Sequence, residues 1–403
     1  MGNRSAVLAG AFRGGRVGRR GSTGGGRRLG FPFEDKSGVG HDRAMSYGLA
    51  EIPADRRIEA PELAYLPRLP EGYRPKIGLI GAGGISEYHL RAYRAMGLDV
   101  AVVCSRSEDK ARKRAEEFFP DAIVCTDYRE VLAHPGVEVV DATPHPAERL
   151  PILEAAIEAG KHVLSQKPFV ENLIDGQRLV RMAREAGVKL AVNQNGRWAP
   201  HFCWMRRAVE AGLIGAVRSV DFSLHWDHSW TAGTPFEEVK HLILGDFGIH
   251  WFDAATAFMG GRMPVTVFAS KVRAAGQTMK PAMLAGVVAP YAEALVTMTF
   301  SALTRHGQED RTVIAGETGT LVASGPGLND QRVRLFTEDG IAEPELKGDW
   351  FTNGFQGTMA ELICAIAEDR EPENGAAGNL KSLAFCQAAM RSADVGVPRA
   401  PLL

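Results

Sequence analysis

The sequence of 403 residues predicts an α/β domain with a parallel sheet, followed by an α+β domain built on a mostly antiparallel sheet. In residues 76–164, short apolar runs alternate with stretches of helical periodicity, which is the pattern of βαβ units around a buried parallel sheet. After about residue 215 longer strand-like runs follow one another, which favours antiparallel pairing. We therefore expect the first domain over 76–195 and the second over 196–403.

The expected elements follow one another in a regular order, and no internal repeat is found. The strands expected in the first domain are 77–80, 100–104, 123–125, 137–142 and 162–164, and its first two helices are 85–96 and 108–119. The strands expected in the second domain are 217–226, 265–272, 294–299, 311–315 and 320–323, and two helices, 358–367 and 379–392, close the chain.

The N-terminal residues differ in composition from the rest of the chain. No acidic residue precedes Glu34, and arginines are interspersed with glycines (Arg13, Arg16, Arg19, Arg20, Arg27 and Arg28). Such a segment cannot bury a core, so we expect a disordered tail over 1–45 and an extended arm over 46–75. The alternatives are a nucleic-acid-binding arm and a twin-arginine export signal at Arg19–Arg20. No apolar segment follows those arginines, and Met45 is an alternative start of the chain.

The overall composition is that of an ordinary soluble globular protein. The net charge is -1, with 45% hydrophobic and 24% charged residues, which argues against a nucleic-acid-binding body. No apolar run approaches the length that spans a bilayer, so we expect no membrane partner. The five cysteines are scattered without a CxxC pair. This pattern predicts a reducing, cytoplasmic location with neither a disulfide framework nor a metal site.

A glycine-rich turn stands where the first strand should meet the first helix. It contains Gly81, Gly83 and Gly84, followed by Ile85. Glycines in this context let the backbone approach a pyrophosphate, which the N-terminus of the helix then stabilises. The usual pattern has Gly or Ala at its sixth position, where this chain has Ser86. The turn predicts a dinucleotide site, and the alternative is a merely tight connection.

The end of the second strand bears on the choice of cofactor. NAD usually needs an acid there for the ribose hydroxyls, whereas this chain has Ser105 and Arg106, with no acid until Glu108. Serine and arginine can bind a 2′-phosphate, so the sequence favours NADP over NAD. The alternative is that Arg106 is only solvated or stacks over the adenine.

Three further residues have the chemistry of an active site. Lys167 lies at the end of the fifth strand, where ligands bind in doubly wound sheets, and its ammonium can stabilise an alkoxide. Asp246 and His250 are four residues apart, which on a helix places them on one face. A histidine can move a proton near neutral pH, although such a pair alone is more often structural.

Taken together, these motifs resemble one known family. Gly81 to Tyr93, the Gln166-Lys167-Pro168 turn and the Asp246/His250 pair occur in the order found in the Gfo/Idh/MocA oxidoreductases. The resemblance covers roughly residues 75–400. It implies a Rossmann domain followed by an open-faced sheet domain, often used for oligomerisation, and hence a homodimer or homotetramer.

The resemblance also implies roles for individual residues. Lys167, Asp246 and His250 match the catalytic triplet of the family, and the peptide before Pro168 is often cis in relatives. The cofactor residues are expected to be Gly81, Gly83, Gly84, Ile85, Ser105, Arg106, Thr143, Pro144, Gln166, Lys167 and Asn195. Two residues depart from the family pattern, because Gln166 replaces the usual Glu and Glu148 stands where relatives often have His.

Other polar and aromatic residues are candidates for the substrate site. Asn195 and Arg197 lie at the expected crossing into the second domain. They could bind the substrate or the cofactor, and the alternative is that they cap the domain junction. Trp226 and His228 suit a sugar ring and its hydroxyls, and the alternative is packing at an oligomer interface. Asp253 either orients His250 or caps a neighbour.

These residues together predict an NAD(P)-dependent dehydrogenase or reductase. It would transfer a hydride between the cofactor and a CH–OH or C=O group of a sugar, polyol or related hydroxy compound. His250 would take the hydroxyl proton, Lys167 would stabilise the oxyanion, and Asp246 would orient His250 or bind a neighbouring hydroxyl. Two alternatives are a glycosidase or epimerase that retains its nicotinamide without net redox, and a non-catalytic sugar or cofactor sensor.

Overall fold

The computed structural model describes residues 56–403, so the predictions for residues 1–45 lie outside the described residues. The first sheet has six parallel strands in the order β3-β2-β1-β4-β5-β6. Its strands are β1 Lys76–Ile80, β2 Asp99–Cys104, β3 Ile123–Cys125, β4 Val137–Ala142, β5 His162–Gln166 and β6 Leu190–Asn193. Its helices are α1 Ser86–Ala95, α2 Glu108–Phe118, α3 Tyr128–Ala133, α4 Pro146–Glu158 and α5 Leu173–Glu185. The predicted doubly wound α/β domain is confirmed.

The order of the strands creates the crevice that the sequence predicts. The chain winds outward from β1 to β3 and then crosses back to β4, which pairs with the other edge of β1. The loops after β1 and β4 therefore diverge, and ligands bind at such a switch point. Helices cover these strands, so Ile77 and Leu79 of β1 and Val139 and Val140 of β4 are fully buried.

The second sheet has eight strands in the order β14-β13-β12-β11-β7-β10-β9-β8. They are β7 Val217–His225, β8 Phe268–Val272, β9 Leu284–Pro290, β10 Leu295–Ser301, β11 Glu309–Gly316, β12 Gly319–Gly325, β13 Arg332–Thr337 and β14 Gly340–Ala342. Every pair in it is antiparallel except β7 with β10, which confirms the mostly antiparallel sheet. The sequence analysis did not anticipate β9, β13 and β14.

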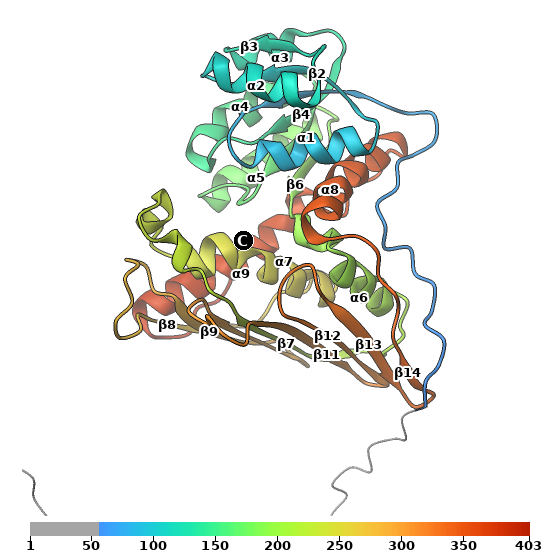
Figure 1. Cartoon of the computed structure of the whole chain (residues 1–403), viewed down its shortest axis with the longest axis vertical. Helices are drawn as coiled ribbons and strands as arrows, with labels where there is room; N and C mark the ends of the chain where they lie inside the picture. Colours follow the sequence, from blue (N-terminus) through green and yellow to red (C-terminus); the bar gives the residue numbers. More distant parts are fainter. Residues whose placement is uncertain (1–55) are drawn as a thin grey trace, which may run out of the picture. The chain divides into compact units, whose positions relative to one another are not determined.

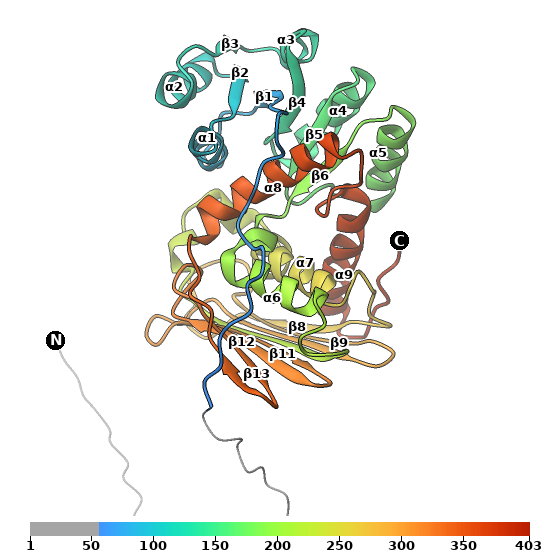
Figure 2. The same ribbon diagram turned by 90° about the vertical axis from the view of Figure 1, so that its right-hand side faces the viewer.

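Helices cover one face of the second sheet. They are α6 Pro200–Glu210, α7 Ile249–Phe258 and α9 Ala376–Val395, whereas no helix of the described residues lies on the opposite face (Figures 1 and 2). Along β7 the side chains of Val220, Phe222 and Leu224 point to the helices and are almost fully buried. The alternate residues are half-buried, so the sheet has one closed and one open face.

The helix α8 (Trp350–Ala367) connects the second domain back to the first. It packs on α1, and its Phe355, Met359 and Leu362 share a buried apolar cluster with Ile77 and Leu79 of β1. The expected division at residue 196 assigns α8 to the second domain by its place in the chain. Its apolar side chains nevertheless complete the core of the first domain.

The described residues include part of the expected extended arm. Residues 56–75 contain no helix, and Arg57 forms an isolated bridge with Ile341 of β14. No helix within residues 56–403 is long and apolar enough to cross a membrane. All five cysteines are buried and free of disulfides.

Candidate active site

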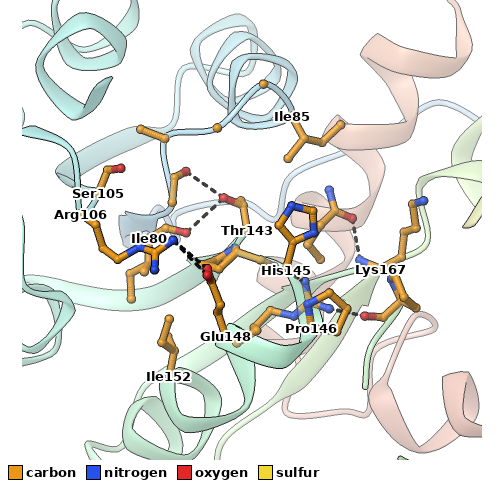
Figure 3. A pocket seen from close by; sticks show the side chains of 18 of the residues that line it. Ile80, Ile85, Ser105, Arg106, Thr143, His145, Pro146, Glu148, Ile152 and Lys167 are labelled. Atoms are coloured by element: carbon orange, nitrogen blue, oxygen red, sulfur yellow. Dashed lines mark hydrogen bonds and ion pairs between the residues drawn. The ribbon is translucent and has the colours of Figure 1, made fainter. Parts of the chain in front are cut away.

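A cleft of about 970 Å³ extends from the carboxyl ends of the first sheet to the segment that precedes α7. The glycine turn, the ends of β2 and β4 and the turn after β5 line it from the first domain (Figure 3). The second domain contributes Phe236, Val239, Gly245 and Asp246. The cleft therefore brings together residues that lie far apart in the sequence.

The glycine turn is shaped to receive a phosphate group. Gly81 has φ +102°, and a Cβ there would lie 2.5 Å from Oγ1 of Thr143, so a side chain is excluded. Thr143 Oγ1 lies 3.1 Å from the carbonyl oxygen of Ile80 and 2.8 Å from that of Gly81 and donates its hydrogen bond to them. A Cβ at Gly83 or Gly84 would meet no protein atom within 4 Å. The turn thus leaves open space at the N-terminus of α1, which fits the pyrophosphate of a dinucleotide.

The residues after β2 line the same cleft. Ser105, Arg106 and Lys110 all contribute to it. Nη2 of Arg106 lies 3.0 Å from Oε1 of Glu148, which belongs to the first turn of α4 (Figure 3). The predicted Pro144 and Ile85 also line the cleft.

Gln166 belongs to a buried polar network behind the lysine. Its Oε1 accepts a hydrogen bond from the backbone amide of Lys167 at 2.6 Å, and its Nε2 lies 3.1 Å from Nε2 of His89. His89 Nδ1 lies 2.7 Å from a carboxylate oxygen of Asp141, and the Tyr93 hydroxyl donates to the same oxygen at 2.7 Å. Burial and Asp141 raise the pKa of Tyr93 well above its usual value.

His89, Tyr93 and Asp141 were not among the site residues predicted from the sequence. His89 and Tyr93 lie four residues apart on α1, and Asp141 is an acid within the apolar run of β4. A polar residue in an otherwise buried strand needs a partner, and this signal was available in the sequence.

Lys167 and Asp246 form an ion pair at the end of the cleft that lies between the two domains. Nζ of Lys167 is 3.1 Å from Oδ1 of Asp246 and 2.9 Å from its main-chain oxygen. The two side chains are 19% and 26% exposed, so the pair is accessible to a small molecule. The Lys167–Pro168 peptide is cis.

Asp246 and His250 do not share one regular helix. Asp246 lies in a π-helical turn, η4 (Leu242–Phe247), whereas His250 belongs to α7, and Gly248 joins the two segments. Among the described residues no hydrogen bond joins Asp246 to His250. The expectation that Asp246 orients His250 therefore needs correction, since the carboxylate pairs with Lys167 instead.

His250 lies on α7 and is not among the residues that line the cleft. Its Nδ1 is buried without a partner, and its ring packs edge-on against Trp350 with the centroids 5.7 Å apart. Gly196 makes this packing possible, because a Cβ there would lie 2.9 Å from the Trp350 ring. Burial, and then the charge of Lys167, lower the pKa of His250 well below its usual value, so the imidazole is neutral at pH 7.

The structure gives Arg197 the contacts of the second of its two expected roles, at the domain junction. Its Nε and Nη2 donate to Asp253 at 2.5 and 2.9 Å, and its Nη1 donates to the carbonyl oxygen of Glu373 at 2.6 Å. Asp253 also accepts a hydrogen bond from Ser382 at 2.8 Å. This buried pair ties α7 to the segment after β6 and to α9, so these hydrogen bonds of Arg197 and Asp253 hold the structure together.

Three other expected site residues lie apart from the cleft. Asn195 is 6% exposed, and its Oδ1 accepts from Nε1 of Trp350 at 3.3 Å. Trp226 and His228 stack with their ring centroids 5.4 Å apart and line a separate small cavity of about 10 Å³. Phe236 and Val239 from the same loop region face the cleft instead.

The fold and the cleft together define a class of protein, the two-domain dinucleotide-binding oxidoreductases with acid–base groups between the domains. A family model described as "Oxidoreductase family, NAD-binding Rossmann fold" matches residues 75–194, and the GFO/IDH/MocA C-terminal domain matches residues 202–322. The chain belongs to the GFO/IDH/MocA family of oxidoreductases and has its NAD-binding domain.

Several relatives of this chain have named activities. A D-apiose dehydrogenase of Paraburkholderia graminis is 27% identical over 348 residues, which cover 80% of this chain and 88% of the relative. An inositol 2-dehydrogenase of Rhizobium meliloti is 26% identical over 334 residues, which cover 79% and 96%. An oxidoreductase from Agrobacterium radiobacter, solved in complex with NAD+, L-tartaric acid and magnesium, shares the fold with a TM-score of 0.73. It is 22% identical, and the match covers 82% of this chain and 99% of that one.

Proposed function

We propose that the protein is an NAD(P)-dependent dehydrogenase that oxidises a CH–OH group of a sugar, a polyol or a related hydroxy compound. The observation that carries the proposal is the Lys167–Asp246 ion pair at the end of the glycine-turn cleft, with Nζ and Oδ1 3.1 Å apart and a neutral His250 close by. Relatives named D-apiose dehydrogenase and inositol 2-dehydrogenase support this class of substrate.

The chemistry is divided between the cofactor and the residues of the chain. A bound nicotinamide dinucleotide supplies the hydride acceptor or donor. His250 takes the hydroxyl proton at Nε2, because its Nδ1 is buried. Lys167 donates a hydrogen bond from Nζ to the substrate oxygen and stabilises the negative charge that develops there. Asp246 holds the ammonium of Lys167 in place.

We propose that NADP is the preferred cofactor. The first three residues after β2 include no acid, and Ser105, Arg106 and Lys110 line the cleft beside it. A 2′-phosphate can accept hydrogen bonds from these donors.

We also propose that the protein forms a homodimer or homotetramer through the open face of the second sheet. Large apolar side chains are exposed on its strands β8, β9 and β10, namely Phe268 at 42%, Val288 at 44% and Leu295 at 41%. Phe268 and Val288 are partners across β8 and β9, and neighbouring exposed apolar side chains can mark an interaction site. Light scattering after size exclusion tests this, and a monomer would contradict it.

The proposed activity is tested by incubating sugars and polyols with NAD and with NADP and following the absorbance of the reduced nicotinamide. His250→Ala should lower turnover at least about a hundredfold while the cofactor still binds. His306→Ala, which removes an exposed histidine of the β10–β11 loop, is the matched control and should behave like the wild type. Unchanged turnover in His250→Ala would contradict the proposal.

A further inference from the structure

Arg106 and Glu148 form an ion pair across one end of the cleft. Arg106 follows β2 and Glu148 lies in the first turn of α4, so the pair joins the segments that follow the two strands on either side of β1. Nη2 of Arg106 lies 3.0 Å from Oε1 and 3.2 Å from Oε2 of Glu148. Figure 3 shows the two side chains pointing toward each other beside Ser105.

This end of the cleft is where the adenosine ribose of a dinucleotide binds in a doubly wound sheet. The acid that usually follows β2 in NAD-binding proteins is absent, and Ser105 stands there. The acidic residues that line the cleft within the described chain are Glu148, Glu171 and Asp246. Asp246 pairs with Lys167 at the other end, so Glu148 is the acid that meets the β2 loop.

We propose that Glu148 is a specificity residue that weakens the preference for NADP created by Ser105, Arg106 and Lys110. It keeps the Arg106 guanidinium occupied and places a negative charge beside the position of the 2′-phosphate. The proposal rests on the dinucleotide site of the proposed function. NAD has a 2′-hydroxyl, which can donate a hydrogen bond to the carboxylate. The 2′-phosphate of NADP is a dianionic acceptor, so it is repelled by Glu148 and competes with it for Arg106.

The ion pair can be broken without loss of the fold. The Arg106 and Glu148 side chains are 85% and 46% exposed, and exposed pairs contribute little to folding stability. The substitution Glu148→Gln keeps the length of the side chain and removes its charge. The variant therefore changes the electrostatics of the adenosine end and leaves the packing of α4 as it is.

The expected change in affinity follows from Coulomb's law. A carboxylate and a dianionic phosphate about 5 Å apart in water-like surroundings repel each other enough to weaken binding roughly tenfold. Glu148→Gln should therefore raise the affinity for NADPH relative to NADH about tenfold. Arg106→Ala should lower the affinity for NADPH and leave that for NADH nearly unchanged.

The test is an equilibrium titration of the full chain with NADH and with NADPH, followed by the fluorescence of the reduced cofactor. The matched control is Glu171→Gln, which removes an acid that lines the same cleft without pairing with Arg106, and its NADPH-to-NADH ratio should equal that of the wild type. A ratio in Glu148→Gln within twofold of the wild type would overturn the inference.

Binding and turnover separate this inference from the proposed function. If Glu148→Gln shifts the ratio but no compound is oxidised, the inference stands and the proposed activity fails. If hydride transfer occurs and the ratio does not move, the inference alone is overturned. If neither reduced cofactor binds to the wild type, both are overturned.

Discussion

Asp246→Asn tests the ion pair that holds Lys167 in the cleft. The asparagine keeps the shape of the side chain and a neutral acceptor, and the bond from Nζ of Lys167 to the main-chain oxygen, now 2.9 Å, does not depend on the carboxylate. The variant therefore removes the charge that faces Nζ across 3.1 Å. With an effective dielectric constant of about 40 to 80, that attraction amounts to about 1 to 3 kcal/mol.

This energy sets the size of the expected effect. If the ion pair fixes the ammonium where the substrate oxygen develops its charge, its loss should lower kcat/KM by about 10- to 100-fold. The glycine turn and the residues after β2 are unchanged, so the dissociation constant of the cofactor should stay within twofold of the wild type. Steady-state kinetics with the best compound of the sugar and polyol panel gives the first quantity, and fluorescence titration gives the second.

The matched control is Asp394→Asn. Asp394 pairs with Lys240 at 2.9 Å and with Lys271 at 2.5 Å, and it does not line the cleft, so the variant removes the same charge elsewhere. It should leave kcat/KM unchanged. A kcat/KM in Asp246→Asn that equals or exceeds that of the wild type would refute the view that Asp246 holds Lys167. An equal loss in both variants would point to a general effect on folding.

Three further predictions follow from the described contacts. Asp253→Asn should lower the free energy of unfolding by about 3 to 5 kcal/mol in urea titrations, because it leaves the buried Arg197 without its ion-pair partner. A variant with unchanged stability and a raised KM would instead favour a role of Arg197 in substrate binding. Because the pKa of His250 is lowered, its neutral form persists below pH 6.5. The pH profile of kcat/KM for oxidation should therefore show no loss attributable to His250 between pH 8 and pH 6.5. In Lys167→Met, a proton NMR titration should find the pKa of His250 higher than in the wild type. Gly83→Val should weaken NADH binding at least about tenfold, because the new side chain enters the space for the pyrophosphate. The melting temperature should not fall, since a Cβ at this position meets no protein atom within 4 Å. Unaltered binding of NADH would argue against that position of the cofactor.

The first sheet was predictable from sequence because its strands are buried on both faces. Such strands read as continuous apolar runs, and β2 and β4 lie where the runs 100–104 and 137–142 placed them. In the second sheet β13 was missed, although Val333 and Leu335 alternate with half-exposed or exposed residues as an amphipathic strand requires. β9 was missed because Gly286 and Pro290 interrupt its apolar pattern.

The site could be predicted only where a residue type and its place in the chain pointed to the same chemistry. Lys167 and Asp246 line one cleft because both lie at the ends of elements that the topology brings together. For Arg197 the choice between the substrate and the domain junction stayed open, because its partners Asp253 and Glu373 are distant in sequence. Spacing along the chain cannot reveal such a pairing. The sequence likewise contains nothing except Gly245 and Gly248 that would predict the π-helical turn between Asp246 and α7.

The central claim is that the cleft transfers a hydride between a substrate carbon and a nicotinamide. The most direct measurement uses polyols deuterated at each CH–OH carbon, incubated with the wild-type protein and oxidised cofactor, with the reduced cofactor then analysed by mass spectrometry. The account predicts a reduced cofactor that carries one deuterium, formed at least about a hundredfold more slowly by His250→Ala. Reduced cofactor without deuterium, or conversion of substrate with no reduced cofactor in solution, would contradict it, and the latter result would favour an enzyme that retains its nicotinamide without net redox.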